Sequence, residues 1–216
     1  MADILRMARQ VFCQRGYHQT KVSEIAGRLD IVEGTIFRYF LTKRELFLKA
    51  IESWLLELIA ECDEELKSVE GTWNRLRFVI WKYLTAIHSE PAIFRLMVQE
   101  MRVAAEAETK GIRDLSRRYA ARGLAVAKEG IAAGEFRSDV PMHIIRDLIY
   151  GSIEHHTWAF LRRERDFSPD AAADSLTSVI FRGLSLPETT AVSKHEAVRK
   201  ESAASRTVRG GRGVRS

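Results

Sequence analysis

Residues 32–43 carry side chains whose chemistry suits contact with duplex DNA. An arginine such as Arg38 can bind guanine through two hydrogen bonds or pair with a phosphate, and a glutamate such as Glu33 can accept from N4 of cytosine. Gly34 would let the backbone approach such a surface closely. Each charge also has an ordinary interpretation, since Arg38 could be solvated and Glu33 could favour a helix N-terminus. Whether these residues contact DNA or are ordinary surface charges therefore depends on the helices that position them.

Two short helices joined by a tight turn are predicted around these residues. Apolar side chains recur at i, i+3, i+4 and i+7 from Val22 to Leu29, which is one face of an α-helix. A second helix is predicted over residues 33–39, with Ile36 on its apolar side. Helices of two turns are unstable alone in water, so the pair must pack on neighbours, and Ile31 in the turn is placed to plug that contact. This spacing is typical of a helix-turn-helix, whose second helix enters the major groove.

A set of residues around this motif, with its spacing intact, matches a known family. The set is Phe12, Arg15, Gly16, Tyr17, Thr20, Ile25, Ala26, Gly34, Thr35, Tyr39, Phe40, Lys43, Glu45 and Leu46. Through it, residues 4–50 resemble the N-terminal DNA-binding domain of TetR-type transcriptional regulators. The resemblance implies that the second helix of the motif contacts bases while neighbouring helices grip phosphates. The candidate DNA contacts are Thr20, Val32, Glu33, Gly34, Thr35, Phe37, Arg38, Tyr39 and Lys43.

Two positions in the motif depart from the family pattern. Asp30 stands where the family usually has glycine, and aspartate tolerates a left-handed turn only at some cost. Val32 stands where the family often has Ser or Thr, so the second helix lacks a side-chain cap, although valine methyl groups could contact a thymine. Thr20 could cap the first helix of the motif or contact a phosphate. The operator sequence does not follow from these residues.

The charges of the chain are unevenly distributed. Residues 1–50 hold nine Lys/Arg and five Asp/Glu, residues 51–186 hold eighteen and twenty-one, and residues 187–216 hold seven and three. This split favours nucleic acid as a partner of the N-terminal end. No apolar run approaches the ~20 residues of a membrane span, the N-terminus lacks a signal-peptide pattern, and the two cysteines suggest neither a disulfide framework nor a zinc site. We therefore expect a cytoplasmic protein without a membrane partner, metal or cofactor.

The remaining sequence predicts helices separated by clear breaks, and no alternating strand pattern, so the expected fold class is all-α. A first helix is expected to about residue 14, with Gly16 as its left-handed C-cap, and Thr42 with Glu45 forms a capping box. Helices are predicted over about 42–66, 72–88, 91–101, 108–133, 141–163 and 169–184. We predict a helix-turn-helix DNA-binding domain over residues 1–48, a helical effector-binding and dimerisation domain over 49–186, and a disordered basic tail over 187–216.

Large apolar side chains are frequent in the middle helices. Most would be ordinary core, but the resemblance implies a hollow for a small effector, and such sites are mainly apolar. The candidate ligand contacts are Trp54, Phe78, Trp81, Phe94, Met97, Met101, Arg118, Tyr119 and Trp158. Residues 150–160 are similar to a helix of repressors of fatty-acid degradation, which bind long-chain acyl-CoA, so acyl-CoA is one candidate for a hydrophobic effector. His155 and His156 point ~100° apart on a helix, which favours packing over a metal site.

One helix-turn-helix reads too few base pairs for a unique site, so a homodimer on a palindromic operator is expected, with half-sites ~34–36 Å apart. The two stripes that could form its seam, or an internal core instead, are Ile145, Leu148, Ile149, Ser152, His156, Ala159 and Phe160, and Leu176, Val179, Ile180, Gly183 and Leu184. An effector that favours one tilt of the helix from Lys43 would shift the half-site spacing and release DNA, as in a repressor.

Two other classes of protein stay open. An architectural protein could bind DNA without sequence preference through the basic tail, and salt dependence with competitor DNA would discriminate it from a specific regulator. An all-α enzyme would need a nucleophile and base or a carboxylate pair, and none of the six histidines has a convincing partner by spacing.

Overall fold

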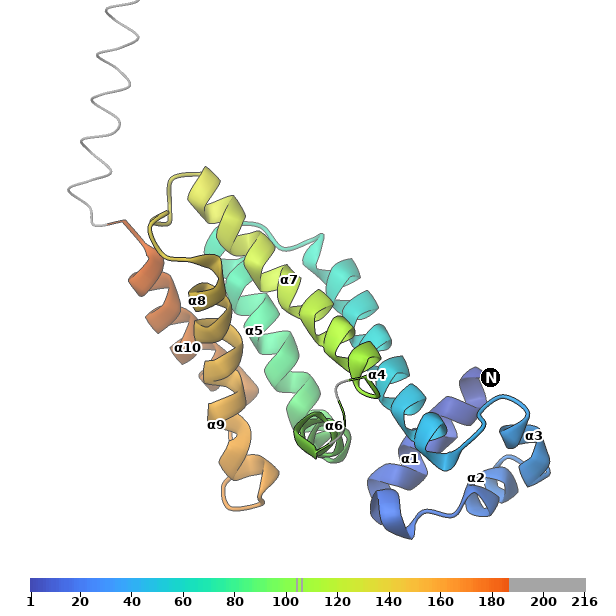
Figure 1. The fold of residues 1–216 in the computed structure, drawn as a ribbon. Helices are drawn as coiled ribbons and strands as arrows, with labels where there is room; N and C mark the ends of the chain where they lie inside the picture. Colours follow the sequence, from blue (N-terminus) through green and yellow to red (C-terminus); the bar gives the residue numbers. More distant parts are fainter. Residues whose placement is uncertain (104, 106, 187–216) are drawn as a thin grey trace, which may run out of the picture.

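The computed structural model describes residues 1–186 except 104 and 106, and these residues form an all-α fold, as predicted (Figure 1). Three helices gather at one end: α1 (Ala2–Gln19), α2 (Val22–Arg28) and α3 (Glu33–Phe37). From them α4 (Lys43–Leu66) leads into a larger helical bundle. The predicted disorder of residues 187–216 lies outside the described residues.

The N-terminal helices pack on a small aromatic and aliphatic core. Phe12, Ile25, Ile36 and Phe47 are fully buried there, one from each of the four helices. The Phe12 and Phe47 rings meet edge to face with centroids 4.9 Å apart, a favourable arrangement of the two quadrupoles. Because α4 contributes to this core, α2 and α3 are held on a support that continues into the rest of the molecule.

The turn between α2 and α3 has the left-handed residue that the departure from the family pattern predicted. Asp30 has φ 53°, and the Ile31 N–H donates to the Ala26 carbonyl at 3.1 Å. Val32 is the N-cap of α3 and makes no side-chain cap, also as predicted. Ile31 packs half-buried against the core, where it closes the angle between the two helices.

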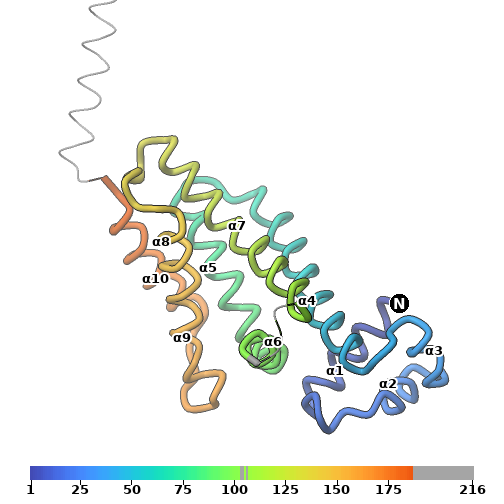
Figure 2. The backbone as a smooth tube through the Cα atoms, in the orientation of Figure 1, coloured from blue at the N-terminus to red at the C-terminus, as the bar shows by residue number. Residues whose placement is uncertain are grey.

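The remaining helices form the larger domain. They are α5 (Thr72–Ser89), α6 (Pro91–Val103), α7 (Lys110–Ala132), α8 (Met142–Arg146), α9 (Ser152–Leu161) and α10 (Pro169–Leu184). In Figures 1 and 2, α4, α5 and α7 run alongside one another, and α8 to α10 cover the side of α5 away from α4. The short α6 crosses the end of this bundle and contacts α1. A helix of the larger domain therefore lies directly against the N-terminal domain.

Local signals fix most of the helix ends. The Thr42 hydroxyl accepts from Glu45 N at 3.0 Å, and the Glu45 carboxylate accepts from Leu41 N at 2.8 Å. The predicted capping box is therefore present, except that the glutamate bonds the N–H of Leu41 instead of that of the N-cap Thr42. Ser168 caps α10 by accepting from Ala171 N at 3.3 Å. Since α4 runs unbroken across residue 48, the exact domain boundary there stays a prediction.

Two helices differ from the sequence-based expectation. In α1 the first helical segment ends at Gly16, which has a positive φ as predicted (φ 75°, ψ 167°), but a second short helical segment follows this kink and reaches Gln19. The helix predicted over residues 141–163 is interrupted by a π-helical turn, η1 (Asp147–Gly151), which joins α8 to α9. The wider turn changes which side chains after it face inward, a shift that a 3.6-residue period does not foresee.

Candidate DNA-binding surface and effector cavities

The α3 helix presents its outer face to solvent while Ile36 anchors its inner face. Val32 is 73% exposed, Phe37 39% and Tyr39 44%. Apolar side chains exposed together on one face make this surface a candidate for contact with a partner. Among the predicted contacts, Glu33, Gly34 and Arg38 are also exposed and Thr35 is half-buried.

Arg38 is a cation on this face and a predicted DNA contact. It takes part in no ion pair of the described residues, and its guanidinium carbon lies 5.5 Å from the centroid of the Tyr39 ring. A Cβ added at Gly34 would meet no atom within 4 Å, so this surface is open above the first turn of α3. Leu41, which the sequence analysis did not single out, is 83% exposed beside it. Its exposure could have been suspected from the sequence, because Leu41 is an apolar residue directly before Thr42, the N-cap of α4.

Lys43 reaches back from the start of α4 to the end of α1. Its ammonium donates to the His18 carbonyl at 3.2 Å and lies 4.7 Å from the centroid of the Tyr17 ring. Burial lowers the pKa of Lys43. The ammonium thus holds the end of α1 against the start of α4.

The expectation for Thr20 needs correction. Thr20 is 2% exposed, and its hydroxyl donates to the Gly16 carbonyl at 2.8 Å. The N-cap of α2 is Lys21, and no side chain caps that helix. The hydroxyl serves instead to satisfy the carbonyl that the kink in α1 leaves free, so it neither caps α2 nor faces a phosphate.

The larger domain contains a cavity of about 310 Å³ between α5, α6, α7 and the η1–α9 segment, here called the tyrosine cavity. Its lining residues are Tyr83, Phe94, Met97, Val98, Met101, Ser116, Tyr119, Ala120, Arg146, Asp147, Tyr150, Gly151 and Glu154. Four predicted ligand contacts, Phe94, Met97, Met101 and Tyr119, come together here. The walls are mainly apolar, as in most sites for small organic ligands.

Three tyrosines form one side of this cavity. Tyr83 stacks on Tyr119 with ring centroids 4.8 Å apart and meets Tyr150 edge to face at 5.9 Å. Burial raises the pKa of all three phenols, so they are neutral near pH 7 and can donate hydrogen bonds. The buried hydroxyl of Ser116 has no hydrogen-bond partner among the described residues. The cavity thus offers polar groups that a bound molecule could satisfy.

Tyr83, Tyr150 and Ser116 were not predicted as ligand contacts from the sequence. Tyr150 lies in the π-helical turn, and its hydroxyl donates to the Tyr119 carbonyl at 3.5 Å. A Cβ at Gly123 would lie 2.9 Å from the Tyr150 hydroxyl, so the glycine makes room for this ring. In the sequence, only the presence of a tyrosine in each of α5, α7 and η1 could have pointed to these contacts.

A second cavity of about 290 Å³ adjoins the first, and is here called the arginine-rimmed cavity. It is lined by Phe94, Arg95, Val98, Gln99, Arg102, Glu154, Trp158, Leu161 and Arg162. Three of these, Phe94, Val98 and Glu154, also line the tyrosine cavity. The guanidinium carbon of Arg102 lies 4.2 Å from the centroid of Trp158, a predicted ligand contact. An apolar interior therefore continues to a cationic rim.

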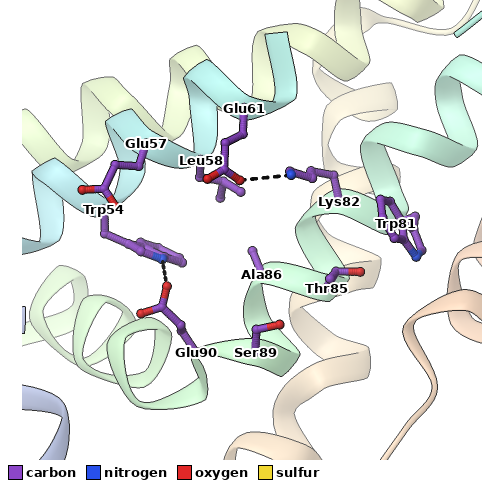
Figure 3. Close-up of a pocket in the computed structure, with 10 residues that line it drawn as sticks. All are labelled: Trp54, Glu57, Leu58, Glu61, Trp81, Lys82, Thr85, Ala86, Ser89 and Glu90. Carbon is purple, nitrogen blue, oxygen red and sulfur yellow. Dashed lines mark hydrogen bonds and ion pairs between the residues drawn. The ribbon is translucent and has the colours of Figure 1, made fainter. Parts of the chain in front are cut away.

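Trp54 and Trp81 belong to another pocket, between α4 and α5, of about 180 Å³ (Figure 3). The Trp54 indole N–H donates to Glu90 at 3.0 Å, and Lys82 pairs with Glu61 at 3.0 Å. This pocket is lined by several charged groups, so the expectation that both tryptophans share one apolar effector site is corrected.

Two further predicted ligand contacts line none of these cavities. Phe78 packs near Trp81 with ring centroids 5.9 Å apart, and Arg118 is exposed on α7. Among the described residues no group of three or more His, Cys, Asp or Glu side chains could hold a metal ion. His156 meets the Phe167 ring edge to face, and its pKa is lowered by burial and by the charge of Arg165. Within the same residues no helix is long and apolar enough to cross a membrane.

A helix-turn-helix with an open outer face, carried by a helix that continues into a hollow helical domain, defines a transcriptional regulator. Residues 4–50 match the model of bacterial regulatory proteins of the tetR family, and residues 70–184 match that of the tetracyclin repressor-like C-terminal domain. Since the second match alone spans more than half of the chain, the protein belongs to the TetR family. The resemblance seen in the sequence is confirmed.

Relatives of the chain include a regulator of fatty acid metabolism and a transcriptional repressor. The chain is 22% identical over 182 residues to the fatty acid metabolism regulator protein of Bacillus subtilis, covering 84% of this chain and 94% of the relative. It is 26% identical over 170 residues to the transcriptional repressor KstR2 of Mycobacterium tuberculosis, covering 77% and 82%. The fold matches the crystal structure of FadR from Bacillus subtilis in complex with stearoyl-CoA, with TM-score 0.74, 22% identity, and 85% and 98% of the two chains covered. These relatives are transcriptional regulators rather than enzymes.

Proposed function

We propose that the protein is a cytoplasmic repressor that binds a palindromic operator as a homodimer and is released by a hydrophobic effector, a long-chain acyl-CoA. The observation that carries the proposal is the pair of adjoining cavities in the larger domain, apolar inside and rimmed by arginines. Such a site suits a molecule with an apolar chain and an anionic head. The stearoyl-CoA bound to the FadR relative supports this class of effector.

The chemistry of the cavities supports a chain that ends in a polar group. Phe94, Met97 and Val98 offer apolar surface for methylene groups, each worth ~0.8 kcal/mol when buried. The free Ser116 hydroxyl can meet a carbonyl such as that of a thioester.

An exposed apolar surface supports the dimer. Ile144 in α8 is 41% exposed, Leu148 in η1 47% and Val179 in α10 74%, and α10 contacts η1. In contrast, Ile149 and Ile180 of the two predicted stripes are buried within the chain. We therefore propose that the outer residues of these stripes form the seam, while the inner ones are core.

The α6 helix links the effector cavities to the DNA-binding domain. One side of α6 lines both cavities, and the helix also contacts α1. At its end, Glu100 pairs with Arg44 of the first turn of α4 at 2.5 Å. An effector that favours one position of α6 would therefore favour one position of α1 and α4, which carry the recognition helix.

Operator binding measured by fluorescence anisotropy tests the proposal. We expect palmitoyl-CoA to lower the affinity of the protein for its own promoter by at least tenfold, and competitor DNA to bind far more weakly than the operator. Arg38→Ala should reduce operator affinity at least tenfold, whereas Arg117→Ala, an exposed control on α7, should not. Equal operator affinity with and without saturating palmitoyl-CoA would rule out this effector.

A reporter assay tests the direction of regulation. A promoter that carries the operator should be less active when the protein is expressed and should recover when fatty acids are supplied. Loss of promoter activity in a deletion strain would instead indicate an activator.

A further inference from the structure

A fourth hollow lies between the start of α6 and the end of α9, and is here called the arginine cleft. Its volume is about 390 Å³, and its lining residues are Pro91, Ala92, Arg95, Phe160, Arg163, Glu164, Arg165 and Asp166. Arg95 also lines the arginine-rimmed cavity, so the two hollows meet at this side chain. The cleft thus continues the effector site outward.

The three arginines that line the cleft form no ion pair with the described residues, whereas its two acidic residues both have partners. Glu164 pairs with Arg162 at 2.7 Å. Asp166 accepts from the Phe167 N–H at 2.8 Å and lies 3.1 Å from His88 Nε2. None of the ion pairs among the described residues involves Arg95, Arg163 or Arg165. Buried in this wall, Arg95 Nε has no acceptor among the described residues.

The backbone at Arg163 adds an independent observation. Arg163 follows α9 with φ 63°, in the left-handed region that glycine occupies most easily at a helix end. Its N–H donates to the Phe160 carbonyl at 2.8 Å, and Glu164 N donates to the Ala159 carbonyl at 2.9 Å, so the helix end is well formed. An arginine here costs stability that glycine would not, which indicates a use for its side chain.

We propose that the arginine cleft binds the phosphate groups of the effector's head while the apolar chain occupies the adjoining cavities, an assignment that rests on the proposed function. Guanidinium groups bind phosphate oxygens through paired hydrogen bonds, and three free guanidiniums match a head with several phosphate charges better than a single carboxylate. The protein therefore distinguishes a phosphorylated thioester from the free acid of the same chain.

Phosphates of DNA are a different occupant for these arginines. Arg163 and Arg165 are exposed at the mouth of the cleft, and all three arginines line a hollow that opens into a cavity. The free donor of Arg95 is buried within that hollow, out of reach of a duplex. Measurement of operator affinity in the variants below separates the two.

Isothermal titration of the full-length protein with palmitoyl-CoA, palmitate and CoA tests the proposal. The variant Arg95→Gln/Arg163→Gln/Arg165→Gln should bind palmitoyl-CoA at least 100-fold more weakly, about tenfold for each of two or more contacts, and palmitate within twofold of wild type. The control Lys110→Gln/Arg117→Gln/Lys128→Gln removes the same charge from exposed positions on α7 and should bind both like wild type.

The variant Arg163→Gly separates loss of ligand binding from loss of folding. It relieves the left-handed backbone, so Tm should rise by about 2–4 °C while palmitoyl-CoA affinity falls about tenfold. A rise in Tm with unchanged affinity would show that Arg163 does not contact the head.

The remaining outcomes separate this proposal from the proposed function. Equal palmitoyl-CoA affinity in wild type and the triple variant overturns the cleft and leaves the effector intact. Weaker operator binding with unchanged ligand binding overturns it in favour of DNA phosphates. If wild type binds neither palmitoyl-CoA nor palmitate, the proposed effector fails, and CoA alone decides the cleft: binding to wild type but not to the variant supports it, and no difference overturns it.

Discussion

Replacement of Glu100 by glutamine should weaken the contact between the effector domain and the DNA-binding domain. The Glu100 side chain is 11% exposed and pairs with Arg44, whose side chain is 29% exposed and also meets Glu108 at 3.2 Å. Burial alone would lower the pKa of Arg44, and the hydrogen bonds and charges of the two glutamates more than offset it. The pair is therefore attractive in spite of its desolvation.

The expected magnitude lies between those of exposed and buried ion pairs. Two unit charges ~4 Å apart near a protein surface attract by ~4 kcal/mol, and desolvation of a mostly buried pair offsets more than half of this. Glutamine keeps one oxygen for Arg44 but no charge. We expect Glu100→Gln to lower the free energy of unfolding by about 1–2 kcal/mol.

Urea denaturation followed by circular dichroism would measure this change. A double-mutant cycle with Arg44→Met isolates the pair, and we expect a coupling free energy of about 1 kcal/mol or more. Glu64→Gln is a matched control, because Glu64 near the end of α4 pairs with Lys67 just after that helix and both side chains are largely exposed, so no measurable change is expected.

The same variant tests how the domains communicate. If the contact between α6 and α4 transmits effector binding, Glu100→Gln should reduce the ratio of operator affinities without and with palmitoyl-CoA by about fivefold, the equivalent of ~1 kcal/mol. A coupling energy of zero, or an unchanged ratio in a destabilised variant, would refute the reasoning.

Three further predictions follow from single residues. Asp30→Gly removes a left-handed aspartate and should raise the free energy of unfolding in urea by about 1 kcal/mol; a decrease would contradict it. Burial, with the nearby charge of Glu90, raises the pKa of Cys13 to about 11, so at pH 8 about one thiolate in a thousand is present. Iodoacetamide should label it rapidly only in urea or as the pH approaches 11, and fast labelling of the native protein at pH 8 would refute this. Leu148→Asp or Val179→Asp should yield monomers by light scattering, whereas Leu41→Asp, exposed in the turn between α3 and α4, should not; dimers in all three would exclude this seam.

Local sequence determined the elements of the fold. The apolar period from Val22 to Leu29, the caps at Thr42 and Ser168, and the break at Gly71 depend on residues within a few positions of one another. Such signals act through backbone geometry and hydrogen bonds within one helix, so they can be read before the helices are assembled. The recognition helix could be predicted for the same reason, since a buried Ile36 and an exposed Arg38 follow from its period.

Tertiary structure alone decided which side chains share a cavity. Trp54 and Phe94 are both large apolar residues at helical spacing in the sequence. In the structure, Trp54 hydrogen-bonds Glu90 in a polar pocket, whereas Phe94 lines the tyrosine and arginine-rimmed cavities. Tyr150 lines the tyrosine cavity from a π-helical turn, and Arg95 and Arg163 line one cleft only because α6 packs against α9. These outcomes depend on the angles at which distant helices pack, and no pattern within one helix encodes those angles.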